Sequence, residues 1–446
     1  MKSMTLQKSI GDVIKELYNS TDEDYMGIFI IDKPVLLIRS PKLVKDILLK
    51  DFATFPDRCV VSPESKPLAS NMMFFKKGPM WKAIRSKMTP VFTSGKLKAM
   101  STLIAKEAEQ LNEYIGKHCN KPNLEAKEIC AKYSTNVIAI CAFGVSAKCF
   151  ESEDAEFRNF GRRIFEFSVA NMIRHIGCFF TPNIIKLFQI SFVKDEILNR
   201  LGDIFTEVLH FRKQQNQLKG NDLVDILLDV MRREDSGLNN DIIISQAIQF
   251  FVAGFETVSG VLSFALYELC INPDIQEKLR QEIQEITEKQ GLTYDSIQEM
   301  KYLDMCVSET LRKYPVLPFL DRVCNSNYKL EGTDHVIEKG QSVYISMFGL
   351  HYDPKYFPEP HKFLPDRFRD KNSINQDGFY YIPFGEGPRI CIGNRFGLMT
   401  VKIGLASILT KYRLCRSSKT PVPIRFQVKS LIVQSDVGIP LKFEPL

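Results

Sequence analysis

The chain has 446 residues, of which 44% are hydrophobic and 25% are charged. This composition is that of a globular protein with a sizeable core, and it excludes a disordered or low-complexity chain. The 59 basic and 53 acidic residues leave a net charge of +6 without a long basic run, so nucleic-acid binding is not indicated.

The amino-terminal segment 1–27 is polar and punctuated by charges. It contains neither the ~20 apolar residues that span a membrane nor the apolar core of a signal peptide. We therefore expect no membrane-spanning segment in the chain as given. Next, Met26–Ile38 has two β-rich runs on either side of Asp32-Lys33-Pro34, a pattern that predicts a β-hairpin.

Most of the following chain has 3.6-residue periodicity or strong helix formers. We predict helices over Lys42–Lys50, Gly95–Lys117, Leu124–Phe143, Ala155–Ile173, Lys194–Gln217 and Leu223–Arg233. No linker or internal repeat divides the chain. The fold class that follows is mainly α with small β-sheets, in a single domain over residues 1–446.

Trp81, the only tryptophan, opens the stretch WKAIR, which ends at Arg85. One helical turn separates the two side chains, so both can point to the same side. Without further context, Arg85 would be taken as a surface residue.

A helix of thirty residues is predicted from Asp241 to Cys270, ending at Asn272-Pro273. It would be about 45 Å long. Apolar residues occupy nearly every face, so it should be a buried central helix.

Within this helix lies the motif AGFET, residues 253–257. Gly254 costs up to about 1 kcal/mol relative to alanine, which suggests that something approaches the backbone closely, and Thr257 can bond back to the Ala253 carbonyl. The alternative is a core helix with an incidental glycine.

Two further helices are expected over Gln276–Glu288 and Leu303–Tyr314, followed by short strands near Gln341–Met347. The second helix contains Glu309-Thr310-Leu311-Arg312, in which residues i and i+3 share a face and can form an ion pair. A solvated surface pair is the alternative.

Cys391 stands in the loop PFGEGPRICIGNRFG, just before a helix predicted from Ile392 to Lys411. The pattern of Phe384, Gly387, Arg389, Cys391 and Gly393 has a chance probability on the order of 10⁻⁴ in a chain of this length. Glycines let the backbone take positive φ and approach a flat ligand, and amides at a helix start can stabilise and tune a metal-bound thiolate. The alternatives are a buried apolar cysteine, or a nucleophilic cysteine, for which no histidine partner motif is visible.

The other cysteines give no competing site. There are eleven in all, an odd number without a CxxC pair, which favours a reducing compartment. Six histidines without a metal-binding spacing argue against a histidine-based metal site.

From about Tyr25 to its end, the chain resembles the cytochrome P450 superfamily of heme-thiolate monooxygenases, particularly microsomal insect members that metabolise xenobiotics. The resemblance implies heme b between the central helix and the helix after the cysteine loop, with Cys391 as the axial ligand of the iron. Phe384 would pack beside the sulfur, and the loop glycines Gly387 and Gly393 would border the cofactor. The expected propionate partners are Trp81, Arg85, Arg322 and Arg389. Arg367, in FLPDRF, would complete a structural triad with Glu309 and Arg312.

The same resemblance assigns the central helix to oxygen activation. Ala253 and Gly254 would border the heme and the O₂ groove, Thr257 would stabilise the oxygen bound to iron, and Glu256 would belong to a proton route. The family more often has a hydroxyl residue where this chain has Val258, which leaves the details of the relay open.

The expected substrate is a neutral lipophile. Counting back from Thr257 at about 100° per residue puts Ala253 and Phe250 on its face. The resemblance adds further apolar lining residues: Phe74, Phe75, Val316, Leu317, Phe319, Leu431 and Ile432. Burial would drive binding, and an unpaired charge would be penalised.

Electrons must come from outside, because no strand–GxGxxG–helix unit is present. The resemblance implies NADPH–cytochrome P450 reductase as the partner, with cytochrome b5 as a second candidate, and consumption of O₂ and NADPH. It places the parent protein on the cytosolic face of the endoplasmic reticulum membrane. The chain starts at what resembles the family's first helix, so we expect that an apolar anchor and hinge are missing through truncation, an incomplete gene model or an unusual isoform.

Two other functions fit parts of this pattern. A heme-thiolate isomerase or dehydratase would rearrange peroxides without a reductase, but the Glu256–Thr257 pair argues against it. A non-catalytic heme-binding sensor would share the cysteine loop and would lack turnover with NADPH and reductase.

Overall fold

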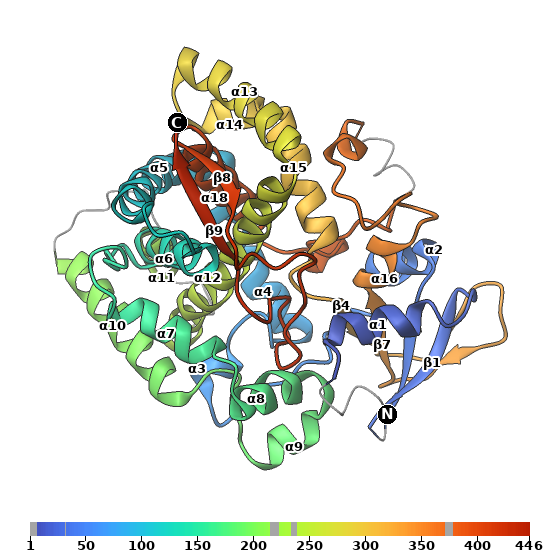
Figure 1. Ribbon diagram of the computed structural model, residues 1–446. Helices are drawn as coiled ribbons and strands as arrows, with labels where there is room; N and C mark the ends of the chain where they lie inside the picture. The colour runs from blue at the N-terminus through green and yellow to red at the C-terminus, as the bar shows by residue number, and fades with distance from the viewer. Residues whose placement is uncertain (1–6, 32, 215–222, 233–238, 371–377) are drawn as a thin grey trace.

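The computed structural model describes residues 7–31, 33–214, 223–232, 239–370 and 378–446 (Figure 1). Helix α12, Asn240–Ile271, runs through the middle of the molecule (Figure 1). Its N-cap Asn239 accepts a hydrogen bond from the backbone of Ile242, and it ends at Asn272 because Pro273 cannot continue it. In the part of the chain described, α12 alone is long and apolar enough to cross a membrane, but 83% of its most apolar window is buried within the fold.

The helices that pack on α12 form the main layer of the molecule. They are α3 (Pro67–Ser70), α6 (Ala126–Ile138), α7 (Glu156–Phe165), α10 (Asp195–Gln214), α11 (Leu223–Arg232), α13 (Pro273–Gln290), α15 (Lys301–Lys313) and α18 (Asn394–Leu409). The remaining helices are α1 (Ile10–Tyr18), α2 (Pro41–Lys45), α4 (Gly78–Met88), α5 (Ser94–His118), α8 (Val169–Phe180), α9 (Pro182–Leu187), α14 (Tyr294–Glu299) and α16 (Met347–Tyr352). The predicted fold class, mainly helical with small sheets, is confirmed.

The largest sheet has the strand order β1-β2-β7-β4. The predicted hairpin is present: β1 (Tyr25–Ile30) pairs antiparallel with β2 (Lys33–Ile38). Strand β7 (Ser342–Ser346) runs parallel to β2, and β4 (Phe319–Val323) pairs antiparallel with β7. A second sheet joins β3 (Leu124–Glu125), β9 (Pro440–Pro445) and β8 (Tyr412–Arg416), and a third joins β5 (Tyr328–Lys329) and β6 (Val336–Ile337).

One predicted helix is wrong in its extent. Ala155–Ile173 is not continuous but forms α7 and α8, which are separated by residues 166–168; the backbone is extended at Glu166, with ψ 144°, and at Ser168, with ψ 153°. Ser168 then caps α8 by accepting a hydrogen bond from the backbone of Asn171 at 3.2 Å. A serine cap and an extended residue therefore override a periodicity that runs through both helices.

Two other predicted helices are not α-helical over their whole length. Lys42–Lys50 contains α2 and then a π-helical turn over Asp46–Lys50, and Leu124–Phe143 starts as β3 and ends in a π-helical turn over Ala139–Phe143. Gly144, at φ 66°, stops the second turn. The predicted helix ends at Gln217 and Arg233 lie outside the described residues.

Helices α6 and α12 pack especially closely. The Ser134 hydroxyl donates to the Phe255 carbonyl at 2.8 Å. A Cβ placed on Gly254 would lie 2.7 Å from Cδ1 of Ile138. These contacts fix α12 at the turn that carries Ala253–Thr257.

Candidate active site

The cysteine loop is shaped by two glycines with positive φ, Gly385 at 73° and Gly387 at 72°. A Cβ on Gly387 would overlap the carbonyl oxygen of Leu48, so no other residue fits there. The amide of Cys391 closes the loop by donating to the Phe384 carbonyl at 2.9 Å. Gly393 has an ordinary φ of −92° as the N-cap of α18, so the expectation of positive φ is wrong for this glycine.

Cys391 differs from every other cysteine of the chain. All eleven lie in the described residues, none of them forms a disulfide bond, and only Cys391 is exposed. Burial among surrounding atoms nevertheless raises the pKa of its thiol, against a backbone hydrogen bond from Gly393 and the charges of Arg85 and Arg58, which lower it. Its free surface therefore faces the interior. A raised pKa disfavours a free nucleophilic thiolate, whereas a bound metal ion would stabilise the thiolate directly.

A cluster of guanidinium groups lies close to the loop: Arg58, Arg85, Arg322 and Arg389. Asp57 pairs with Arg389 at 3.1 Å, and Asp321 pairs with Arg58 at 3.5 Å. Four arginines and two aspartates leave two positive charges without a counterion among these described residues. The cluster would accommodate a group carrying two carboxylates.

The two uncompensated members differ in their hydrogen bonding. Arg322 is 1% exposed and donates from Nη1 to the Asp321 carbonyl at 2.7 Å, while its Nε has no partner among the described residues. Burial and Arg58 lower its pKa to about 9, so it is charged at neutral pH. Arg85 donates to the Ile390 carbonyl at 2.8 Å, next to Cys391.

Trp81 and Arg389 are stacked, with the guanidinium 4.1 Å from the ring centre. Arg389 also donates to the carbonyls of Pro56 and Lys76 at 2.6 and 3.0 Å. Much of its hydrogen-bonding capacity is thus used within the protein, and burial lowers its pKa to about 10. Sequence reasoning missed Arg58, which belongs to no motif and is recognisable only once the fold brings it to Arg322.

On α12, Thr257 donates from Oγ1 to the Ala253 carbonyl at 2.7 Å. Ala253 is exposed although Val252 and Phe255 beside it are buried, so one strip of a core helix remains uncovered. The close approach expected at Gly254 exists, and Ile138 of α6 makes it. The start of α18 is near the same turn, because a Cβ on Gly397 would lie 3.9 Å from Val258.

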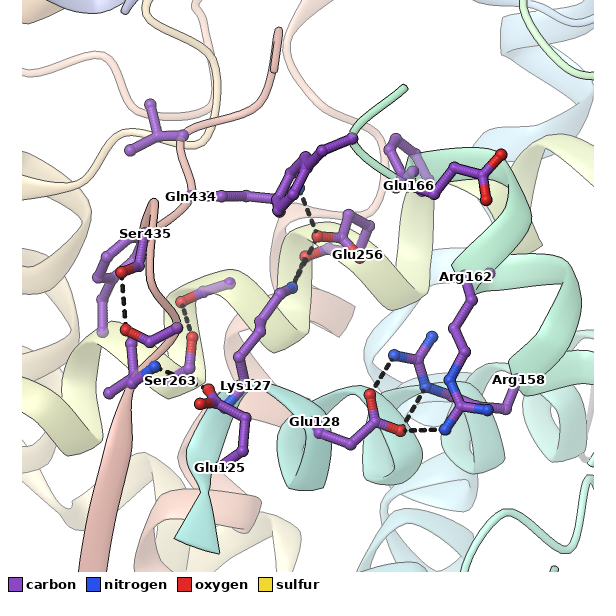
Figure 2. A pocket seen from close by; sticks show the side chains of 18 residues that line it. Glu125, Lys127, Glu128, Arg158, Arg162, Glu166, Glu256, Ser263, Gln434 and Ser435 are labelled. Carbon is purple, nitrogen blue, oxygen red and sulfur yellow. Dashed lines mark hydrogen bonds and ion pairs between the residues drawn. The ribbon is translucent and has the colours of Figure 1, made fainter. Parts of the chain in front are cut away.

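Glu256 is 4% exposed and points toward α6 and the carboxy-terminal segment (Figure 2). Its Oε1 pairs with Lys127 Nζ at 2.7 Å and accepts from Gln434 Nε2 at 2.9 Å. Neither partner was predicted from sequence, since each stands alone in a distant segment without a recognisable motif.

Glu309 and Arg312 form a bidentate ion pair with distances of 2.7 and 2.9 Å, and both side chains are 0% exposed. Arg367 approaches Glu309 at 3.4 Å. The alternative of a solvated surface pair is therefore wrong. Arg312 also donates to the His351 carbonyl at 2.8 Å, and His351 Nε2 accepts from the amide of Ile382, at the start of the cysteine loop. Sequence reasoning missed His351, which links the pair to the loop.

The expected lining residues fall into three places. Phe319 is 2% exposed on β4 and packs on Phe179 and Phe180 of α8 at 5.7 and 5.4 Å. Phe74 and Phe75 stand edge to face at 5.3 Å, and Phe250 contacts Phe92 at 5.5 Å. In the third place two chain segments are hydrogen-bonded: the amide of Val433 donates to the carbonyl of Val316 at 3.0 Å. Leu431 and Ile432 belong to the first segment and Leu317 to the second. Sequence reasoning missed Phe179 and Phe180, because they lie beyond Ile173, where the predicted helix ended, and belong to no motif.

Taken together, the loop and its surroundings present one interior-facing thiol, two uncompensated guanidinium charges and an uncovered strip of α12. A flat metal complex with two carboxylates fits this donor set, because thiolate suits a transition-metal ion and the arginines neutralise the carboxylates.

Comparison with known proteins adds an independent finding. Residues 2–443 match a family model described as Cytochrome P450. Cytochrome P450 6k1 and cytochrome P450 6j1 of Blattella germanica are 38% and 41% identical to the chain, over 99% and 98% of its length and 89% and 88% of theirs. The probable cytochrome P450 6g2 of Drosophila melanogaster is 38% identical over 99% of this chain and 90% of its own.

Proposed function

Because the chain belongs to the cytochrome P450 family and is therefore a monooxygenase, we propose that it inserts one atom of O₂ into neutral, lipophilic molecules, including xenobiotics, on a heme held by Cys391. The observation that most supports this proposal is the interior-facing Cys391 thiol beside two uncompensated arginine charges. A nucleophilic cysteine would need neither the dianion-binding cluster nor a raised thiol pKa.

Heme b fits the residues present. Cys391 would ligate the iron, and Arg85 and Arg322, whose charges are uncompensated, would bind the propionates together with Arg58, Arg389 and Trp81. The bound heme supplies the iron centre at which O₂ is activated and from which one oxygen atom is transferred. Gly387 allows the loop to pass Leu48 and so to present the sulfur from a rigid support.

The chain's own residues control water, protons and orientation. The overall reaction converts substrate, O₂, NADPH and one proton into hydroxylated substrate, water and NADP⁺. Thr257 carries a hydroxyl at the uncovered strip of α12, where it can donate a hydrogen bond to oxygen, and Glu256 one residue earlier can exchange protons. The aromatic side chains of β4 and α8 exclude water from the substrate side.

We further propose that electrons come from NADPH–cytochrome P450 reductase, with cytochrome b5 as a second donor. The likeness to insect P450s supports a location on the cytosolic face of the endoplasmic reticulum membrane. Apolar side chains on α8 and the α9 segment that point to solvent would suit contact with lipid: Val169, Ile173, Ile184, Leu187 and Phe188 are between 48% and 75% exposed.

Turnover with labelled oxygen tests the proposal. Purified protein, reductase and NADPH should convert a lipophilic probe into a product that contains one oxygen atom from ¹⁸O₂. Rearrangement of an organic peroxide without NADPH or reductase, and no such product with them, would favour the isomerase. A normal heme spectrum without any turnover would favour the sensor.

A further inference from the structure

A pocket with a volume of about 500 Å³ lies against α12 (Figure 2). The helix contributes Glu256, Gly260 and Ser263 to its wall. At 100° per residue, these three positions are about a quarter of a turn round the helix from Ala253 and Thr257. The pocket therefore uses a different face of α12 from the uncovered strip at which oxygen is expected.

Much of the pocket lining is apolar. The rings of Phe165, Phe167 and Phe264 contribute to it, together with Val433 and Ile439. A hydrophobic molecule would lose contact with water among these side chains, and the faces of aromatic rings also attract cations.

Gly260 leaves room in this lining. A Cβ built at this position has no heavy atom within 4 Å, although the glycine is in the middle of a helix that is buried over most of its length. The free space beside Gly260 can therefore take part of a ligand without any shift of the protein.

The cationic groups that line the pocket are already paired. Lys127 pairs with Glu256 at 2.7 Å, and Arg158 and Arg162 pair with Glu128 at 2.6 and 2.7 Å. An anion would have to compete with these carboxylates for each cationic group. The pocket therefore does not favour a negatively charged ligand.

Glu125 differs from the other carboxylates of the lining. Glu256 and Glu128 have the partners just described, and Glu166 pairs with Lys194 at 3.3 Å. Within the described part of the chain, Glu125 forms no ion pair, and Figure 2 shows it beside Lys127 at the start of α6. The pocket thus contains one carboxylate that lacks a cation.

The protein backbone holds Glu125 in place. Its Oε1 accepts hydrogen bonds from the amides of Lys127 and Ile439 at 3.2 and 2.7 Å, which leaves Oε2 for a ligand. Gly438, at φ 79°, makes room for this oxygen, because a Cβ there would lie 2.5 Å from Oε2. Burial raises the pKa of Glu125, and a nearby cation would stabilise its ionised form.

We propose that the pocket is a second ligand site, which binds an organic ammonium ion with an apolar body. The positive nitrogen pairs with Oε2 of Glu125, and the body packs on the aromatic rings in the space beside Gly260. Protonated lipophilic amines belong to this class. The expected substrate site penalises an unpaired charge, so the two sites select different molecules. This inference goes beyond the proposed monooxygenase function and does not depend on it.

Equilibrium dialysis of the heme-loaded protein with benzyltrimethylammonium tests the proposal. This cation has no lone pair, so it cannot ligate iron through its nitrogen. We expect one saturable site per chain, with no change in the heme spectrum. Neopentylbenzene, in which carbon replaces the charged nitrogen, should not displace the cation, because it lacks the charge that Glu125 recognises.

Glu125→Gln tests the carboxylate. The glutamine oxygen can still accept the two backbone hydrogen bonds, so the loss of charge is the main change. We expect the dissociation constant of benzyltrimethylammonium to rise by at least about tenfold. Glu107→Gln is the matched control, since Glu107 is another buried carboxylate, accepts from Asn136 at 2.9 Å and lies outside the pocket. This control should leave the dissociation constant unchanged.

Gly260→Leu tests the space. Leucine is the better helix former, and its side chain would fill the free volume, so binding should be lost from a protein that still folds and holds heme. Gly95→Leu is the matched control, because Gly95 also has open space at its Cβ but lies in α5 outside the pocket. It should bind the cation as the wild type does.

Three results would overturn the proposal. The first is the absence of saturable binding to the wild-type protein. The second is displacement of the cation by neopentylbenzene, which would assign the binding to the substrate site. The third is unchanged affinity in Glu125→Gln or Gly260→Leu. None of these results concerns turnover, so each leaves the proposed function untouched.

Discussion

A single hydroxyl, that of Thr257, occupies the uncovered strip of the central helix and is bonded back to the Ala253 carbonyl at 2.7 Å. That bond keeps the hydroxyl in place at little cost to the helix, because a threonine can satisfy itself within one turn. The Thr257 hydroxyl is thus held in place by the Ala253 carbonyl, and another acceptor could take over its hydrogen bond.

We predict that Thr257→Ala leaves heme binding intact and diverts electrons to hydrogen peroxide, because a donor needed while oxygen is being cleaved is lost. The ratio of product to NADPH consumed measures this effect. Thr257→Ser keeps the hydroxyl and should retain most of the ratio. An unaltered ratio in Thr257→Ala would refute the role of the hydroxyl.

Motif residues such as Cys391 and Glu309 could be singled out from the sequence because each stands at a fixed spacing from other motif residues. Arg58, Lys127 and His351 could not. None of them belongs to a motif, and the role of each depends on a partner far along the chain: Asp321, Glu256 and Ile382 respectively.

At the scale of elements, the approach of α6 to α12 determines where the active turn lies. Gly254 meets Ile138, whereas Gly260, six residues later on the same helix, has open space where a Cβ would be. The sequence predicts a close approach at Gly254 but does not reveal which element makes it, because helix pairing depends on the whole fold.

We predict that Gly254→Ala destabilises the protein by about 1–3 kcal/mol through overpacking. Gly260→Ala should be neutral or stabilising by up to about 1 kcal/mol, since alanine is the better helix former. Urea unfolding of the heme-loaded protein measures both. Ile138→Val removes the methyl group 2.7 Å from the added Cβ and should rescue Gly254→Ala. Equal effects of the two glycine substitutions would contradict this packing.

The buried pair of Glu309 and Arg312 connects α15 to the cysteine loop through His351. We predict that Glu309→Ala or Arg312→Ala prevents stable heme incorporation, because an unpaired buried charge costs about 3–5 kcal/mol. The yield of heme per protein chain measures this. Arg163 and Glu196 form a control pair that is also 2.7 Å apart but exposed, and Glu196→Ala should cost little. A normal heme yield in Glu309→Ala would contradict the account.

For the whole molecule, the mainly helical class and its central helix were predictable, because a thirty-residue apolar run has few other solutions. Strands β8 and β9 were not predicted. Both strands are short, and even their paired residues nearest in sequence, Arg416 and Leu441, are separated by 24 intervening residues. No local sequence pattern therefore predicts their pairing. The division between α7 and α8 depends on extended backbone at Glu166 and Ser168, which helical periodicity does not detect.

Acid stability is also a property of the whole fold. Burial lowers the pKa of His175 to about 4 and that of His351 to about 3. Between about pH 6.5 and these pKa values, each histidine is protonated in the unfolded chain but not in the folded protein. The free energy of unfolding therefore falls as the pH falls, by up to about 1.4 kcal/mol per pH unit for each histidine. Buried carboxyls with raised pKa, such as Glu107, act in the opposite direction, so a difference between variants isolates the histidine.

We predict that His175→Phe loses less stability than the wild type between pH 6.5 and pH 5, measured from urea midpoints. Phenylalanine can keep the stacking that His175 makes on Phe192 at 4.3 Å. His210, exposed on α10, provides the control, and His210→Gln should follow the wild type. A His175→Phe profile identical to that of the wild type would mean that folding does not lower the pKa of His175.

The central claim is that Cys391 holds heme iron as a thiolate, and the spectrum of the ferrous protein with carbon monoxide tests it most directly. The wild-type protein should give the strongly red-shifted Soret band of thiolate-ligated heme, and Cys391→Ala should lose that band even if heme is retained by the arginine cluster. A wild-type protein that binds heme without the red-shifted band, or a Cys391→Ala variant that keeps it, would contradict the account.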